Sequence, residues 1–159
     1  MASGIVEYKG DFKSKDYRIA IVASRFNKTI TSNLLDGALE TLIESGISQA
    51  SIFLYWVPGA FEIPVACARI FSENKADGII TLGAVIRGET PHFEVVADRC
   101  SEGVMQVSLE YKKPVIFGVL TTNTVEQAFN RAGLKYGNKG SEAASTLLQM
   151  LGLFDQAGI

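Results

Sequence analysis

Several features that would assign a protein to a familiar functional class are scarce in this sequence of 159 residues. Its two cysteines, Cys67 and Cys100, lie far apart without CxxC or metal-ligand spacing, so we expect buried free thiols and no metal site. The net charge is −2 and no run of Lys or Arg occurs, which argues against a nucleic-acid surface. A GxGxxG motif is also missing, which argues against a dinucleotide site.

Long apolar runs and targeting signals are missing as well. No apolar stretch reaches the roughly 18 residues that span a bilayer, so we expect no membrane association. Residues 1–4 lack the charged-then-apolar layout of a signal peptide, which favours the cytoplasm. No linker, low-complexity tract or repeat interrupts the chain, so we expect one domain over residues 1–159.

Apolar segments of strand length alternate with segments of helical periodicity. The expected strands are 18–23, 51–57, the apolar part of 76–86, and 114–120; the expected helices are 30–45, 61–72, 91–111, a short helix from a capping box at 123–126 to about Gly133, and 141–151. Continuous apolar strands between helices indicate a parallel sheet that is covered on both faces. We therefore predict the α/β class: a three-layer α-β-α sandwich with a central, mainly parallel four-stranded sheet of flavodoxin-like topology.

Right-handed crossovers place the carboxyl ends of all parallel strands at one edge of the sheet, where such folds bind ligands. The turns at 24–27, 58–62, 87–90 and 121–123 should therefore converge there. A further short segment, 5–8, also reads as a strand but has no adjacent partner. One hypothesis is that it pairs with the sheet edge of a neighbouring subunit.

The segment 83–92 is the most informative part of the chain. It leaves an apolar strand and turns at Gly88, after which Thr90 and Pro91 suit the N-cap and first position of a helix. The free backbone N–H groups and the dipole at such a helix start favour an anion such as phosphate. His92, the only histidine, follows in the first turn. It is a candidate proton-transfer group, and a purely structural histidine is the alternative.

The glycine spacing in this segment resembles the opening of a P-loop. Gly83 and Gly88 are correctly spaced, but Glu89 and Thr90 replace the Lys-Ser/Thr pair, which argues against a standard nucleoside triphosphate site. A small phosphorylated metabolite remains as the expected anion.

Other strand-end residues have two interpretations each. Arg131 is a candidate phosphate ligand, and a solvated surface role is the alternative for it, as for Lys135 and Lys139. Phe26 suits stacking on a flat ring or a contact between subunits. Glu62 suits a helix-dipole partner or a hydrogen-bond acceptor for a ligand.

Taken together, these segments resemble the lumazine synthase family. The matching stretches are 25–27, 56–64, 81–93, 115–121, 126–128 with 131–133, and 137–140. They cover essentially the whole chain after about residue 15, and the VPGAFE and RGxTxHF motifs in this order are highly specific.

The resemblance implies a cofactor-free transferase of riboflavin biosynthesis. It would condense 5-amino-6-(D-ribitylamino)uracil with 3,4-dihydroxy-2-butanone 4-phosphate. The amine attacks the ketone, the carbinolamine dehydrates to an imine, phosphate is eliminated, and the ring closes to 6,7-dimethyl-8-ribityllumazine.

The resemblance also implies a site built from two adjacent subunits. The implied roles fall on Phe26 (pyrimidine stacking), Ala84, Val85 and Ile86 (its polar edge), Ala60, Phe61 and Glu62 (the ribityl chain), Glu89, Thr90 and Arg131 (the phosphate), His92 (proton transfer), and Phe117 and Lys139 (reaching in from the neighbour).

The family forms homopentamers, and in some members these close into an icosahedral capsid that can enclose riboflavin synthase. The compact segment 133–140 resembles the shell-forming members. The rival hypothesis is a non-catalytic flavin-binding or container protein on the same fold. It is weakened because His92, Arg131, Glu62 and Phe26 are all present. Without the resemblance, the residues indicate only a parallel α/β protein with a small-phosphate site and a candidate acid–base histidine.

Overall fold

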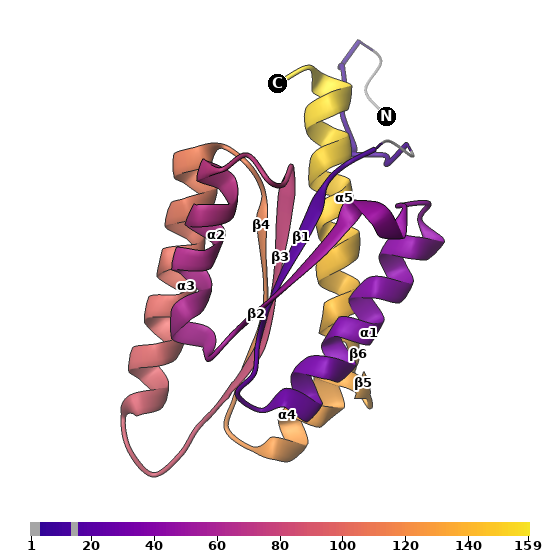
Figure 1. The fold of residues 1–159 in the computed structure, drawn as a ribbon. Coiled ribbons are helices and arrows are strands. Elements are labelled where there is room, and N and C mark those ends of the chain that lie inside the picture. Colours follow the sequence, from indigo (N-terminus) through magenta and orange to yellow (C-terminus); the bar gives the residue numbers. More distant parts are fainter. Residues whose placement is uncertain (1–3, 14–15) are drawn as a thin grey trace.

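The computed structural model describes residues 4–13 and 16–159, which fold around a parallel sheet (Figure 1). The four strands are β1 (Ile19–Ser24), β2 (Ile52–Val57), β3 (Gly78–Ile86) and β4 (Val115–Thr122). They lie in the order β2-β1-β3-β4 and every pairing among them is parallel. The predicted α/β class and its flavodoxin-like strand order are confirmed.

Helices cover both faces of the sheet. The helices α1 (Lys28–Glu44) and α5 (Lys139–Ala157) lie on one face, and α2 (Ile63–Ser72) and α3 (His92–Tyr111) lie on the other (Figure 1). The shorter elements are α4 (Val125–Arg131), the 3-10 turns η1 (Gln49–Ser51) and η2 (Ala60–Glu62), and the strands β5 (Ala132–Leu134) and β6 (Gly137–Asn138).

The sheet separates two apolar cores. Ile21 faces the core under α1 and α5, whereas its neighbour Val22 faces the core under α2 and α3, because successive strand residues point to opposite faces. Both cysteines lie in the second core as free thiols, as the sequence predicts. Burial raises the pKa of Cys67 and of Cys100 to about 12, so both thiols stay protonated at neutral pH.

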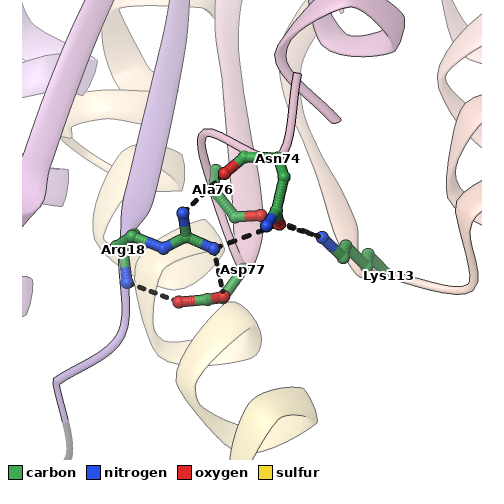
Figure 2. Close-up of polar contacts among 5 residues, drawn as sticks. All are labelled: Arg18, Asn74, Ala76, Asp77 and Lys113. Carbon is green, nitrogen blue, oxygen red and sulfur yellow. Dashed lines mark hydrogen bonds and ion pairs between the residues drawn. The ribbon is translucent and has the colours of Figure 1, made fainter. Parts of the chain in front are cut away.

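Polar contacts join three loops at the amino end of the sheet (Figure 2). Arg18, just before β1, pairs with Asp77, just before β3: its backbone N–H donates to Oδ2 at 2.7 Å and its Nη2 to Oδ1 at 3.0 Å. Arg18 also donates to the Asn74 carbonyl, and Lys113 donates to the Ala76 carbonyl at 3.2 Å. Charge pairing therefore holds these loops together at the amino edge of the sheet, opposite the carboxyl ends of the strands.

Some helix starts differ from the predicted ones by one or two residues. The N-cap of α3 is Pro91 instead of Thr90, whose Oγ1 only approaches the His92 N–H at 3.5 Å. The N-cap of α4 is Thr124, one residue later than predicted, because its hydroxyl accepts from the Gln127 N–H.

The last third of the chain carries more regular structure than predicted. Helix α5 extends beyond the expected 141–151 at both ends. Its start is fixed by Asn138, whose side chain accepts from the N–H groups of Gly140 and Ser141. The segment read as a compact turn contains the small antiparallel pair of β5 and β6.

The segment 5–8 forms no strand within this chain. Ile5 and Val6 are 72% and 75% exposed, whereas the N–H groups of Lys9 and Gly10 bond to Gln156 at the end of α5. Pairing of this segment with another subunit stays a prediction. Among the described residues, no helix combines the length and apolar character needed to cross a bilayer.

Candidate functional site

The carboxyl ends of the four strands meet at the lower edge of the sheet in Figure 1, and backbone hydrogen bonds tie the loops there together. The Arg25 N–H donates to the Val57 carbonyl at 2.8 Å, and the Phe26 N–H donates to the Pro58 carbonyl at 3.2 Å. The turn after β1 is therefore held against the turn after β2.

Asn27 explains how β1 turns sharply into α1. It adopts the left-handed backbone region with φ 58°, which asparagine tolerates better than most residues. Its Nδ2 donates to the Ala84 carbonyl at 2.9 Å, so the same residue also fixes this turn to β3. Phe26, immediately before it, is left 72% exposed.

A second exposed aromatic lies beside the carboxyl edge on η2. Phe61 is 56% exposed, whereas Ala60 before it is buried. The carboxylate of Glu62 lies over its own turn: its Oε2 is 3.1 Å from the position that a Cβ on Gly59 would occupy. Large apolar side chains on exposed turns mark surfaces that bind a ligand or a partner.

The turn from β3 into α3 carries the predicted phosphate and proton-transfer residues together. Glu89, Thr90 and His92 are all exposed there. The N-cap residue of α3, Pro91, makes no side-chain hydrogen bond to the helix, and the His92 N–H has only a 3.5 Å contact with Thr90 Oγ1, so this helix start can receive an anion.

Arg87 is a residue that the sequence reasoning did not assign to the site. Its Nε donates to Asn123 Oδ1 at 2.9 Å, and its Nη1 pairs with Glu94 in the first turn of α3. The hydrogen bond from Arg87 holds the pKa of the Glu94 carboxyl below its usual range. The sequence signal for this contact was the pair of opposite charges at Arg87 and Glu94, which lie seven residues apart on either side of the turn.

A hollow of about 460 Å³ lies beside the edge strand β4 and the start of α5. Phe117, Arg131 and Lys139 all line it. Arg131 Nη1 donates to the Gln127 carbonyl at 3.0 Å, and Lys139 Nζ pairs with Glu142 Oε2 at 2.7 Å. Glu142 also lines the hollow and offsets the charge of Lys139, so Arg131 is the cation that favours an anionic ligand there.

The candidate residues thus fall into two groups. Phe117, Arg131 and Lys139 share the hollow at the β4 edge, so Arg131 lies with the residues expected to serve a neighbouring subunit. The remaining candidates lie on the carboxyl-end loops or the last residues of β3: Phe26, Ala60, Phe61, Glu62, Ala84, Val85, Ile86, Glu89, Thr90 and His92. Among the described residues, no group of three or more His, Cys, Asp or Glu side chains is placed to hold a metal ion.

Strand order, exposed aromatics and an open helix start define an α/β protein of flavodoxin-like topology with candidate ligand-binding residues at the carboxyl edge of its sheet. A family model described as 6,7-dimethyl-8-ribityllumazine synthase matches residues 16–155. The chain belongs to the 6,7-dimethyl-8-ribityllumazine synthase family.

Two relatives carry that same name. The protein from Pediococcus pentosaceus is 53% identical over 147 residues, covering 92% of this chain and 94% of the relative. The protein from Protochlamydia amoebophila is 52% identical over 153 residues, covering 96% and 89%. Among solved structures, a GDP-L-fucose synthetase from Naegleria fowleri aligns with a TM-score of 0.41 at 12% identity. That alignment covers 98% of this chain and only 49% of the other, and the likeness is too loose to support a conclusion.

Proposed function

We propose that this chain is a cofactor-free transferase that condenses 5-amino-6-(D-ribitylamino)uracil with 3,4-dihydroxy-2-butanone 4-phosphate. The products are 6,7-dimethyl-8-ribityllumazine, inorganic phosphate and water. The observation that carries this proposal is the family match over residues 16–155, with relatives at 52–53% identity that are named for this product.

The carboxyl edge suits the pyrimidine substrate. Exposed Phe26 offers a ring face for stacking, and the backbone groups of Ala84, Val85 and Ile86 at the end of β3 offer donors and acceptors for the polar edge of the ring. Glu62 is the acceptor that we assign to the ribityl hydroxyls, beside Ala60 and Phe61.

The start of α3 suits the phosphate of the second substrate. The N–H groups of Glu89 and Thr90 are the donors that we assign to it, and the helix dipole favours its charge. The guanidinium of Arg87 on the same turn is already engaged by Glu94 and Asn123. A further cation is therefore required, and Arg131 is the candidate.

The division of the candidate residues between the hollow and the carboxyl-end loops supports a site that two subunits share. In this chain, Arg131, Phe117 and Lys139 line their own hollow at the β4 edge. We propose that the hollow of one subunit faces the carboxyl edge of the next in a homopentamer, which places Arg131 at the neighbour's phosphate. The carboxyl edge supplies exposed Phe26 and Phe61 and the backbone groups, and the hollow adds the cations of Arg131 and Lys139.

Positioning should supply most of the acceleration. Alignment of two reactants is worth effective molarities of about 10⁵ M or more, whereas one acid–base group contributes about 10²–10⁴-fold. We assign to His92 the transfer of protons during carbinolamine dehydration and phosphate elimination. Its exposure at the α3 start leaves the imidazole accessible to a ligand on that turn.

The test mixes the purified protein with both substrates and follows lumazine absorbance and phosphate release against a no-protein control. Equal amounts of lumazine and phosphate, formed well above the control rate, would support the synthase. Binding of riboflavin with no acceleration of either product would replace it with the flavin-binding alternative.

A further inference from the structure

We propose that Arg87 is a positioning residue for this reaction: its guanidinium fixes the turn that carries His92 against the end of β4. The inference rests on the proposed role of His92 and extends it by naming the contact that sets the place of the imidazole. Arg87 itself touches neither substrate in this arrangement.

Arg87 joins three segments at once. Its backbone N–H donates to the Thr122 carbonyl at 2.9 Å, which continues the ladder between β3 and β4. Its Nε donates to Asn123 Oδ1 at 2.9 Å, and its Nη1 forms an ion pair with Glu94. Its guanidinium carbon also lies 4.5 Å from the ring centroid of Phe93. Backbone and side chain together anchor both ends of the turn.

The turn between these anchors has few contacts of its own. A Cβ added at Gly88 would meet nothing within 4 Å, so no neighbour packs against that position. The His92 N–H has only a marginal 3.5 Å contact with Thr90 Oγ1. The direction of the turn therefore depends on its two ends, and the pair of Arg87 with Glu94 closes directly across it.

Direct phosphate binding by Arg87 is the alternative that the contacts disfavour. Its Nε and Nη1 already serve Asn123 and Glu94, and the carboxylate offsets its charge. An incoming phosphate would compete with an ionised carboxylate for the same guanidinium. The planar fork also accounts for the choice of arginine, since a lysine ammonium lacks the rigid, spread donors that reach two partners in fixed directions.

The first experiment measures kcat at saturating concentrations of both substrates for Arg87→Met, Arg87→Lys and Glu94→Gln, each in the native and the His92→Ala background. We expect Arg87→Met to lower kcat about tenfold or more in the native background, because small misplacements of reacting groups are costly. In the His92→Ala background we expect Arg87→Met to change kcat less than about twofold, because Arg87 acts through His92. Arg87→Lys should recover little.

Arg99→Met is the matched control. Arg99 pairs with Glu102 on the exposed side of the same helix at 2.5 Å, so its loss removes an arginine and an ion pair without touching the turn. We expect its kcat to equal that of the native protein. Glu94→Gln breaks the Arg87 pair from the other side, and it keeps the test usable if Arg87→Met folds poorly.

The second experiment needs no synthase activity. His92 is the only histidine, so the rate of its acylation by diethyl pyrocarbonate, followed by mass mapping of the peptide that contains it, reports on this one imidazole. We expect Arg87→Met and Glu94→Gln to change that rate more than about twofold, because the turn loses its clamp. Arg99→Met should leave it unchanged.

Two results would overturn the inference. Equal loss of kcat in both backgrounds would show that Arg87 acts independently of His92. A raised KM for the butanone phosphate in Arg87→Met, with Glu94→Gln unaffected, would make Arg87 a phosphate ligand. If the native protein forms no lumazine, the proposed function fails, and unchanged acylation rates would separately reject the positioning role.

Discussion

Replacing Asp77 with asparagine removes one negative charge from the amino edge of the sheet while keeping the size of the side chain. The Asp77 carboxylate faces both the backbone N–H and the guanidinium of Arg18, at 2.7 and 3.0 Å (Figure 2). Burial by itself would raise the pKa of Asp77, but the hydrogen bonds from Arg18 and the charges of Arg18 and Lys113 outweigh it and lower the pKa. We therefore expect Asp77→Asn to destabilise the protein at neutral pH.

The magnitude follows from the two bonds and their exposure. Hydrogen bonds to a charged group contribute about 1.5–3 kcal/mol. The Arg18 and Asp77 side chains are 40% and 33% exposed, so solvent screening reduces this contribution. Asparagine also keeps an acceptor for the Arg18 N–H. We expect a loss of about 1 kcal/mol, which corresponds to an apparent Tm lower by about 2–4 °C for a chain of this size.

The sign of the pH dependence follows from the lowered pKa. The unfolded chain takes up a proton on this group more readily than the folded chain does. The Asp77 contribution is therefore complete above the unfolded pKa of about 3.9 and is lost as pH falls through the lower, folded value. The Tm difference between native protein and variant should be full at neutral pH and shrink below about pH 4.

The assay is thermal unfolding followed by circular dichroism, at one fixed subunit concentration because assembly makes the apparent Tm concentration-dependent. Glu73→Gln is the matched control, since Glu73 pairs with Arg69 at 3.8 Å in an exposed position. It should change Tm by less than about 1 °C. The reasoning is refuted if Asp77→Asn matches the native Tm at neutral pH, or if its deficit persists undiminished in acid.

Five further predictions concern the site and its support. His92→Ala should lower kcat about 10²-fold or more yet leave activity above background, because substrate positioning survives; a completely inactive variant would contradict this. Arg131→Ala should reduce kcat/KM further than His92→Ala, and an unimpaired variant would remove Arg131 from the phosphate site. Refolding His92→Ala and Arg131→Ala subunits together should restore part of the activity, which it cannot do if each site lies within one chain. Phe26→Ala should raise KM for the pyrimidine about tenfold through lost stacking, measured against an unchanged KM for the butanone phosphate. Gly140→Ala should lower the apparent Tm strongly, since its Cβ would lie 1.9 Å from the Leu34 carbonyl oxygen, and a native-like Tm would exclude that contact.

Local patterns in the sequence determined the elements and their order along the chain. Five apolar residues in a row at 19–23 indicate a strand covered on both faces, and all six residues of β1, Ser24 included, are buried. The turn signals at Pro58, Gly59 and Gly88 placed loops at the strand ends. The position of His92 at a helix start was predictable for the same reason, although the cap itself lies at Pro91. The N-cap of α4 was predicted less accurately because Asn123 and Thr124 are adjacent and both can cap a helix, and the Thr124 hydroxyl is the one that accepts from the Gln127 N–H.

Contacts between distant residues were beyond the reach of these patterns. Arg87 lies 36 residues from Asn123, and nothing in the spacing indicates that their side chains meet. The N-terminal stretch around Gly10 packs against α5 for an equally non-local reason: a Cβ there would lie 2.5 Å from the Gln149 carbonyl oxygen. Such close approaches depend on the packing of whole helices.

The sequence by itself determined the α/β class, the boundaries of the buried strands to within a residue or two, and the residues that carry the family motifs. These features follow from local hydrophobic periodicity and turn chemistry, which each segment encodes on its own. Only the tertiary structure decided that Phe117, Arg131 and Lys139 line one hollow, whose lining does not include Phe26 or His92. That division arises because the register of β3 with β4 and the docking of α5 are set by long-range packing, which no local segment of sequence specifies.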